Sequence, residues 1–245
     1  QENVCAKAEL MGRDRDGAFT DLLAVPARNV YPIPDEINDQ TAPLLQVLTT
    51  CLHAQRQTKL FPQDSVVVLG LGVSGLLHLQ LAKARGAHPV IGVTRSGSKR
   101  SLAARLGADL VIDPSDPALK EQVAEATQGQ GPDLAIECVG KTETLAQAID
   151  VVRVGGRIIV FGTITEEAGE LPFYQLYYKE LSLVNPRAAK PEDFPASVEL
   201  VAAGTIELDP LITHTFPFES AEEAIAATRE SVSLKVILDH GSDAR

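Results

Sequence analysis

The stretch that decides the fold runs Ser65-Val66-Val67-Val68-Leu69-Gly70-Leu71-Gly72-Val73-Ser74-Gly75, and an apolar segment at 76–82 follows it directly. Its first five residues form a short apolar run, which is typical of a buried strand. The segment at 76–82 is longer and predicts a helix that begins near residue 73. Three glycines therefore separate a predicted strand from a predicted helix.

Each glycine of this Gly-x-Gly-x-x-Gly pattern has its own role in a phosphate-binding turn. Gly70 permits the tight turn, Gly72 leaves room for a pyrophosphate beside the backbone, and Gly75 lets the helix pack closely on the strand. The helix would begin at Val73 and Ser74, so free N–H groups and the positive dipole end would face the phosphates. Because a strand precedes the pattern and a helix follows it, the sequence favours a dinucleotide-binding site over a turn without a ligand.

Strands and helices alternate through the central part of the chain. Apolar runs predict strands at 65–69, 89–93, 110–112, 134–139, 157–161 and 181–184. Amphipathic segments predict helices at 73–85, 98–106, 118–127 and 142–152. Six strands with intervening helices favour an α/β fold built on a doubly wound, parallel six-stranded Rossmann sheet. Ligands of such sheets bind beyond the carboxyl ends of the strands.

The two ends of the chain break this alternation. Segment 15–34 predicts irregular or β structure, and a helix is predicted at 41–59. In the tail, the patterns predict a helix at 194–203, a strand at 212–216, a helix at 221–228 and a strand at 234–238. The central α/β domain is therefore expected to lie between two pieces of another domain.

The charge pattern indicates which dinucleotide fits. The chain carries a formal net charge of −11, yet no Asp or Glu occurs between residues 65 and 108. A site for NAD places an acidic residue about 20 residues beyond the glycines, on the ribose 2′-hydroxyl. Here the second strand is followed instead by Thr94, Arg95, Ser96, Lys99 and Arg100. Arg95 attracts a 2′-phosphate and the two hydroxyls can bind it, so NADP is favoured over NAD.

The alternative for these basic residues is an ordinary solvated helix start. Basic side chains at a helix N-terminus oppose the helix dipole, which favours the presence of a compensating anion.

Composition excludes several classes of protein. The negative balance argues against general nucleic-acid binding, and no apolar run is long enough to predict a membrane span. The cysteines Cys5, Cys51 and Cys138 are odd in number and widely spaced, and the first residues do not resemble a signal peptide. We therefore expect a reduced, cytoplasmic protein with neither nucleic acid nor membrane as its partner.

Six short motifs extend across the chain from residue 1 to residue 214. They are Gln1-Glu2-Asn3-Val4-Cys5, Gly70 to Gly75, Leu106-Gly107-Ala108-Asp109, Glu137-Cys138-Val139-Gly140, Gly155-Gly156-Arg157 with Gly162, and Asp209-Pro210-Leu211-Ile212-Thr213-His214. Together they resemble the C-terminal two-thirds of a medium-chain, zinc-type alcohol or polyol dehydrogenase. The resemblance implies that residues 1–42 and 185–245 belong to a β-rich, GroES-like catalytic domain, with the dinucleotide-binding Rossmann domain at 43–184.

The resemblance also implies further cofactor contacts. Val139 and Gly140 match the loop that lies against the nicotinamide. Gly162 and Thr163 match the segment whose backbone binds the carboxamide. Lys235 matches a basic position that reaches the pyrophosphate, although an exposed strand lysine is an equal alternative.

The metal positions of the family are poorly matched. Cys5 corresponds to the last of four cysteines that hold a structural zinc, and the other three would precede residue 1. Gln46 falls where the family places a Cys or Glu ligand of the catalytic zinc, and an uncharged carboxamide is a poor zinc ligand. Zinc is therefore expected only in a longer chain.

The resemblance implies hydride transfer between NADP(H) and a small alcohol or polyol, or its carbonyl compound. Two alternatives stay open: a zinc-free reductase of enones or quinones from the same superfamily, which Gln46 favours, and an NADP(H)-binding module without catalysis. No catalytic acid or base is assigned. A homodimer or homotetramer is expected, because members of the family often join their sixth strands edge to edge.

Overall fold

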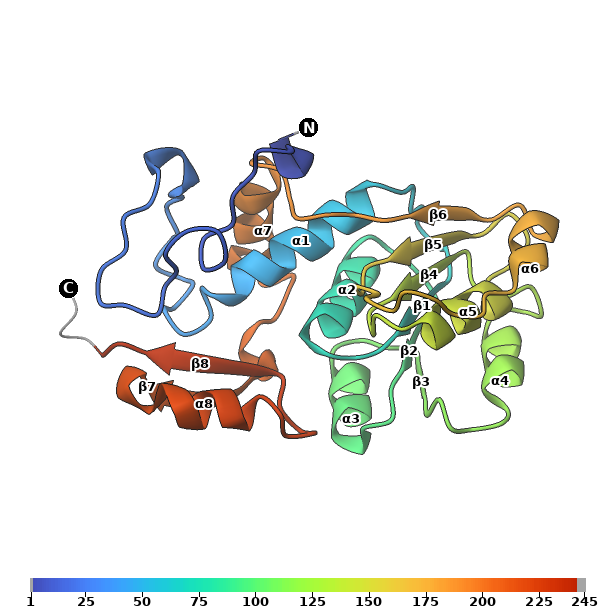
Figure 1. The fold of residues 1–245 in the computed structure, drawn as a ribbon. Coiled ribbons are helices and arrows are strands. Elements are labelled where there is room, and N and C mark those ends of the chain that lie inside the picture. Colours follow the sequence, from blue (N-terminus) through green and yellow to red (C-terminus); the bar gives the residue numbers. More distant parts are fainter. Residues whose placement is uncertain (1, 242–245) are drawn as a thin grey trace.

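The computed structural model describes residues 2–241 and contains the six-stranded parallel sheet (Figure 1). Its strands are β1 (Val66–Leu69), β2 (Val90–Val93), β3 (Leu110–Ile112), β4 (Leu134–Glu137), β5 (Arg157–Val160) and β6 (Ser182–Val184). Their order is β3-β2-β1-β4-β5-β6, and each neighbouring pair is parallel. The predicted doubly wound α/β fold is confirmed, and its switch point lies between β1 and β4. Residue 1 and residues 242–245, in the predicted flanking parts, lie outside the described residues.

The helices of this domain agree with the predicted ones to within one residue at each end. They are α2 (Val73–Ala84), α3 (Gly97–Arg105), α4 (Leu119–Ala126) and α5 (Thr142–Val151). Helix α6 (Phe173–Tyr178) was not predicted. None of its residues is buried, so it lacks the alternation of apolar and polar positions that reveals an amphipathic helix.

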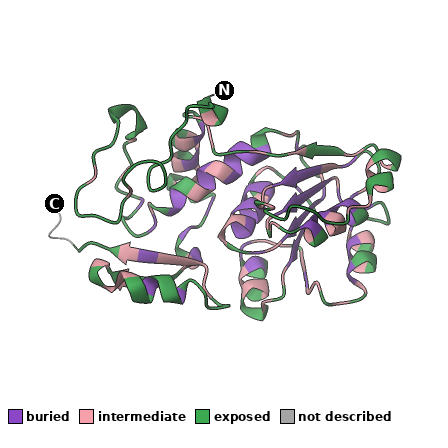
Figure 2. Cartoon of the chain, in the orientation of Figure 1, coloured by how far each residue is buried: buried purple, intermediate pink, exposed green. Residues whose placement is uncertain are grey.

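The central strands β1, β2 and β4 are buried on both faces because helices cover both sides of the sheet (Figure 2). Along β1, Val66 and Val68 belong to one hydrophobic cluster, which includes residues of α2 and α3. Val67 and Leu69 belong to a second cluster, which includes residues of α4 and α5. This alternation follows from the two-residue period of a strand and explains why the strands read as continuous apolar runs.

Helix α1 (Leu44–Arg56) precedes β1. After β6 the chain forms α7 (Asp193–Ala202), η3 (Asp209–Leu211), β7 (Ile212–Pro217), η4 (Phe218–Ser220), α8 (Ala221–Ala227) and β8 (Lys235–Asp239). Strands β7 and β8 form a separate parallel pair. Residues 2–43 contain only the 3-10 helices η1 (Glu2–Val4) and η2 (Ala27–Asn29) and one isolated bridge between Met11 and Arg15. Segment 15–34 is thus irregular rather than β.

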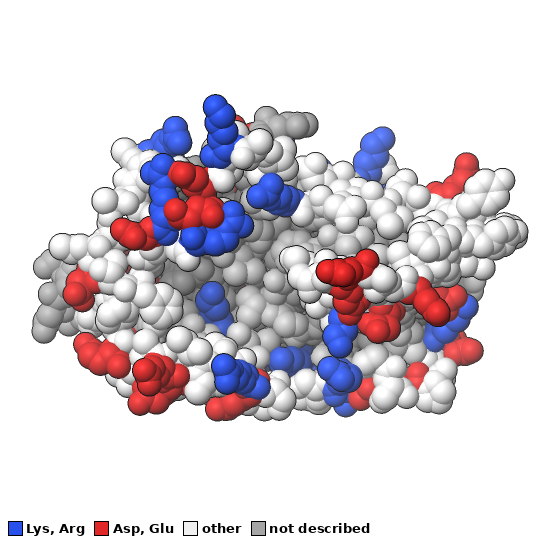
Figure 3. Space-filling view, viewed as in Figure 1, with Lys and Arg blue, Asp and Glu red and all other residues white. Residues whose placement is uncertain are grey.

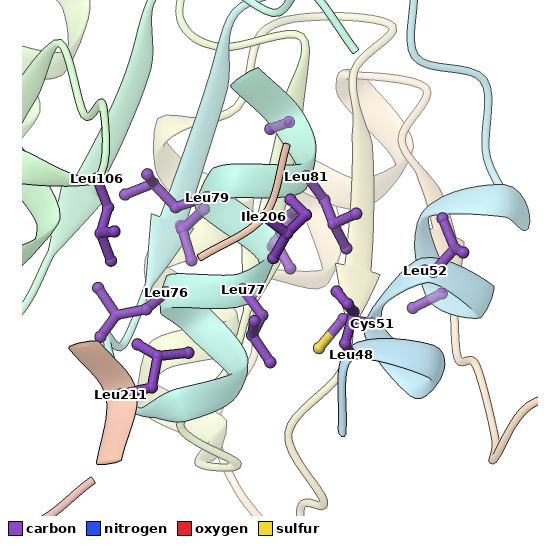
Figure 4. Packing of buried hydrophobic residues seen from close by; sticks show 14 of the residues in the cluster. Leu48, Cys51, Leu52, Leu76, Leu77, Leu79, Leu81, Leu106, Ile206 and Leu211 are labelled. Atoms are coloured by element: carbon purple, nitrogen blue, oxygen red, sulfur yellow. The ribbon is translucent and has the colours of Figure 1, made fainter. Parts of the chain in front are cut away.

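Helix α1 joins the two parts of the chain. Figure 4 shows Leu48, Cys51 and Leu52 of α1 beside Leu77 and Leu81 of α2, all in one cluster of buried side chains. The same helix packs along α7. Cys51 is thus a buried residue of α1, whereas the domain boundaries at 43 and 185 stay a prediction.

A buried carboxylate on α7 connects this helix to α1. Asp193 is buried, and its Oδ2 lies 2.7 Å from Nδ1 of His53, while Arg56 donates to Oδ1 at 2.6 Å. Burial raises the carboxyl pKa of Asp193, but the hydrogen bonds from the Lys190 backbone, Arg56 and His53 together hold that pKa below its ordinary value. Asn3 Nδ2 lies 3.2 Å from Nε2 of His53, so the first residues are attached to the same junction.

Among the described residues, no helix combines the length and the apolar character that crossing a membrane requires.

His78 is a fully buried imidazole in the α1–α2 interface. Gln55 donates to the His78 carbonyl at 2.9 Å, and its side-chain nitrogen also lies 3.2 Å from Nδ1 of His78. The Phe161 ring packs edge-on against the imidazole of His78, with the two ring centroids 4.6 Å apart. Burial lowers the pKa of the His78 imidazole to about 3, because the charged form would lose its hydration.

We expect His78 to make the fold sensitive to acid. The unfolded imidazole takes up its proton near pH 6.5, whereas the folded one stays neutral until about pH 3. The stability that His78 contributes is therefore present above pH 6.5 and is lost as the pH falls towards 3. Between about pH 7 and about pH 5.5 this linkage lowers the free energy of unfolding by about 1 kcal/mol.

Urea unfolding at the two pH values measures the effect in wild type and in His78→Leu. The variant is expected to lose this part of the pH dependence, while His240→Gln, at an exposed histidine, keeps it. An unchanged pH dependence in His78→Leu would contradict the prediction.

Candidate dinucleotide site

The turn between β1 and α2 has the geometry that its three glycines predict. Gly70 has φ +92°, a conformation that other residues rarely adopt. A Cβ at Gly75 would lie 1.9 Å from the Gly70 carbonyl oxygen, so only glycine permits the close approach of α2 to β1. A Cβ at Gly72 would meet no atom within 4 Å, and this residue is exposed. The turn is thus closed on one side and open on the other.

The open side lies at the N-terminus of α2. Gly72 caps the helix without a side-chain hydrogen bond, and Val73 and Ser74 are its first residues. The unbonded N–H groups of this first turn carry the positive end of the helix dipole. The arrangement can bind a phosphate or pyrophosphate group.

Three strand ends meet beside this turn. A Cβ at Gly70 would lie 2.5 Å from Cγ2 of Val139, which places the residues after β1 and β4 in contact. A Cβ at Gly140 would lie 2.8 Å from the Thr163 carbonyl oxygen, and one at Gly162 would lie 2.2 Å from the Gly140 nitrogen. The segments after β1, β4 and β5 therefore form one continuous edge, and Val139 and Thr163 are exposed on it.

The basic residues after β2 differ in what they contact. Among residues 2–241, no hydrogen bond or ion pair involves the Arg95 guanidinium, and the side chain is exposed. Ser96 and Ser98 face each other with their hydroxyl oxygens 3.0 Å apart. Burial lowers the pKa of the Lys99 ammonium, which also has no partner in the described part of the chain. Arg95 and Lys99 are thus available to an anion.

Arg100 is engaged by the protein itself. Its Nη1 donates to the carbonyl oxygens of Thr94 and Arg95, each at 2.9 Å, and to Oδ2 of Asp113 at 2.7 Å. Arg100 therefore fixes the loop that carries Arg95. This loop does have a carboxylate beside it, because Asp113 follows β3, whose carboxyl end lies beside that of β2.

Lys235 lies at the start of β8, outside the Rossmann sheet. Its neighbours Leu234 and Ile237 belong to the cluster that includes Leu76 of α2, so β8 packs onto the same core as the glycine turn. Burial lowers the pKa of the Lys235 ammonium. In Figure 3 the surface is hollowed between the part with β7 and β8 and the part with the main sheet, and basic side chains lie in and beside the hollow.

A contact that no local pattern of the sequence predicts holds the segment after Thr163. Oε2 of Glu166 accepts a hydrogen bond from the Thr142 N–H at 2.8 Å and another from the Thr142 hydroxyl. These two bonds lower the pKa of the Glu166 carboxyl, and the bond from the hydroxyl has the larger effect. They attach the segment after β5 to the first residue of α5.

The described residues do not fit a zinc ion. No group of three or more His, Cys, Asp or Glu side chains lies close enough together to hold a metal within residues 2–241. Cys5 and Gln46 are both exposed. Burial raises the pKa of the Cys51 and Cys138 thiols, which disfavours the thiolate that zinc requires.

Comparison with known proteins identifies the family. Residues 74–203 match the family model described as zinc-binding dehydrogenase. The chain belongs to this family. The L-threonine 3-dehydrogenase of Pyrococcus abyssi is 32% identical over 97% of the chain and 68% of its own length. The sorbitol dehydrogenase of Halalkalibacterium halodurans is 29% identical over 96% of the chain and 69% of its own length. The resemblance to medium-chain, zinc-type dehydrogenases is therefore confirmed.

Solved structures of dehydrogenases have the same fold. A zinc-binding dehydrogenase from Sinorhizobium meliloti 1021, bound to NADP, superposes with a TM-score of 0.90 at 30% identity, over 97% of this chain and 70% of that one. The short chain alcohol dehydrogenase of Escherichia coli CFT073, complexed with NADH, superposes with a TM-score of 0.88 at 30% identity. The match covers 96% of this chain and 70% of that one. The chain spans about 70% of these two structures.

The different surroundings of Gly72 and Gly75 lead to a prediction. Gly72→Ala adds a methyl group to open space, so the protein should fold with little loss of stability yet bind dinucleotide at least about tenfold more weakly, because the methyl occupies the approach to the backbone. Gly75→Ala should lower the unfolding midpoint strongly, since its methyl meets the Gly70 carbonyl. Urea unfolding and titration with NADPH and NADH measure both effects. Unchanged affinity in Gly72→Ala would contradict the assignment.

Proposed function

We propose that this protein is an NADP(H)-dependent dehydrogenase that transfers a hydride between the cofactor and an alcohol or polyol, or its carbonyl compound. The observation that carries this proposal is the glycine turn between β1 and α2, open at Gly72 and adjoining the ends of β4 and β5. Membership of the zinc-binding dehydrogenase family supports it. A bound nicotinamide supplies or accepts the hydride, while the protein supplies binding and orientation.

The site residues divide between the two halves of a dinucleotide. The pyrophosphate is proposed to lie at the start of α2, against Gly70, Gly72, Val73, Ser74 and Gly75. The partly buried Lys235 is proposed to contact it as well. Val139, Gly140, Gly162 and Thr163 are proposed to line the nicotinamide half, which their contact along one edge supports.

The charges after β2 favour the phosphorylated cofactor. Arg95 and Lys99 have no anionic partner within residues 2–241, although the chain carries a net charge of −11. The carboxylate of Asp113, beside this loop, is paired with Arg100. A 2′-phosphate would meet Arg95, Lys99 and the hydroxyls of Thr94 and Ser96. One similar solved structure holds NADP and another holds NADH, so the comparisons do not choose between the two cofactors. The proposed preference for NADP(H) therefore rests on these local charges.

Reversing the charge at Arg95 tests the preference. In Arg95→Asp the affinity for NADPH should fall at least about tenfold, while the affinity for NADH should stay equal or rise, because a 2′-phosphate would meet a carboxylate and a 2′-hydroxyl could donate to it. Arg105→Asp, at the other end of α3, makes the same change in net charge and should leave the ratio unaltered. Equal loss for both dinucleotides would remove Arg95 from the site.

A second candidate function rests on Gln46. A carboxamide at the position where the family places a charged zinc ligand favours a zinc-free reductase of enones or quinones. Titration with NADPH and NADH, followed by assays on alcohols, polyols, enones and quinones with and without Zn²⁺, separates the candidates. Turnover of enones or quinones alone would support the second function. Binding without any turnover would indicate a non-catalytic NADP(H)-binding module, and no binding would overturn both.

The free edge of the main sheet supports a homodimer, or a homotetramer built from such dimers. Strand β6 is the last strand of the sheet, so the backbone groups on its outer side have no partner strand within residues 2–241. Leu183 is 36% exposed on it, and Tyr174 and Tyr177 of α6 are 69% and 81% exposed. An unpaired edge of this kind can pair with the same edge of a second copy.

Placing a charge on this edge tests the assembly. Leu183→Lys should shift the protein from dimer to monomer in sedimentation velocity experiments, because a lysine on an edge strand opposes edge-to-edge pairing. Val232→Lys, at another exposed apolar position, should leave the assembly unchanged. A wild-type monomer, or a dimer that persists in Leu183→Lys, would contradict the proposal.

A cytoplasmic location is proposed on the state of the cysteines. Cys5, Cys51 and Cys138 are all free, and a reducing compartment keeps thiols in that form.

A further inference from the structure

Glu137 is a buried carboxylate at the last position of β4, with an exposed fraction of zero. Its Oε1 accepts three hydrogen bonds, from the N–H of Val139 at 2.8 Å, the N–H of Gly140 at 2.9 Å and the hydroxyl of Thr144 at 2.7 Å. A buried carboxylate is costly unless it is hydrogen-bonded, and bonds to a charged acceptor are strong. The turn after β4 and the first turn of α5 therefore take their positions from one oxygen atom.

The backbone of Glu137 holds the neighbouring strand. Its carbonyl oxygen accepts from the N–H of Phe161 and the N–H of Gly162, each at 2.9 Å. Glu137 thus connects the segment after β4, through its side chain, with the segment after β5, through its main chain. No other residue within 2–241 makes both connections.

The second oxygen of this carboxylate has no hydrogen-bond partner among residues 2–241. Oε2 is buried and lies toward Gly162, where an added Cβ would be 2.6 Å from Oε2 and 2.2 Å from the Gly140 nitrogen. The space between the two segments is therefore filled by the carboxylate and by the Gly162 backbone. Glu137 sets how far apart the segments lie.

The shape of the turn after β4 also reaches the glycine turn. Cγ2 of Val139 lies 2.5 Å from the position that a Cβ of Gly70 would take. A displacement of Val139 would alter the surface above Gly70, and a displacement of Gly140 would alter its contact with Thr163. All three segments of the candidate site therefore depend on the turn that Glu137 holds.

We propose that Glu137 is a positioning residue for dinucleotide binding: its buried carboxylate shapes the turn of Val139 and Gly140 against Gly162, so that the ends of β1, β4 and β5 present one surface to the cofactor. Glu137 itself does not touch the cofactor. This inference rests on the proposed function, because it concerns the same site.

Asp133, at the start of the same strand, provides a matched control. It directly precedes β4, and its Oδ2 accepts from the Ser65 N–H at 2.8 Å and the Ser65 hydroxyl at 2.7 Å, while Oδ1 accepts from Arg153 Nε at 2.7 Å. Asp133 and Glu137 therefore both bind backbone N–H groups with a carboxylate. They lie at opposite ends of β4, and only Glu137 lies at the edge with the candidate site.

The experiment compares wild type, Glu137→Ala, Glu137→Gln and Asp133→Ala by urea unfolding and by fluorescence titration with NADPH and with NADH. Both alanine variants should unfold at lower urea. Glu137→Ala should bind the dinucleotide at least about tenfold more weakly, whereas Asp133→Ala should stay within about twofold of wild type. Glu137→Gln keeps a carbonyl acceptor for the turn, so its affinity should remain within about threefold even though its amide group lowers stability.

Three results would overturn the inference: wild-type affinity in a folded Glu137→Ala, equal loss of affinity in Asp133→Ala, or equal loss in the Gln and Ala variants. If Glu137→Ala fails to fold, Gly162→Ala changes the same spacing from the β5 side, and wild-type affinity in that variant would overturn it. Failure of the proposed function is recognised separately, because wild type itself would then bind neither dinucleotide.

Discussion

The close approach of α2 to β1 is the constraint on which the rest of this structure depends. Gly75 lies so near the Gly70 carbonyl that no side chain fits between them, and this brings the start of the helix directly over the end of the strand. The helix N-terminus then opens at Gly72, at the switch point between β1 and β4. A single steric requirement thus creates both the tight core under the turn and the open surface above it.

At this edge of the sheet, hydrogen bonds engage the carboxylates that hold the site together and leave two basic side chains available to a ligand. Asp113, Glu137 and Glu166 are each used by the protein, on Arg100, on the turn after β4 and on Thr142 respectively. Arg95 and Lys99 have no such partner within residues 2–241. These three carboxylates therefore bind groups of the protein itself, and the charge that the loop after β2 presents to a ligand is positive although the whole chain is negative.

Most of the architecture could be predicted because its signals are local. Short apolar runs mark strands that are buried on both faces, and amphipathic segments mark the helices between them. Helix α6 gave no such signal, since none of its residues is buried. For segment 15–34 the sequence predicts irregular or β structure without deciding between them, because its prolines exclude a regular helix without specifying what replaces it.

By itself, the sequence determined the order of strands and helices, the glycine turn, the cluster of cations after β2 and the family. Only the tertiary structure decided how those cations divide. Arg100 and Asp113 are 13 positions apart, and they meet because β3 lies beside β2 in the sheet. Glu137 likewise connects the segments after β4 and β5 because these two strands are neighbours and the segments that follow them lie in contact. Contacts between strand ends depend on the pairing of strands, which a local pattern of residues does not encode.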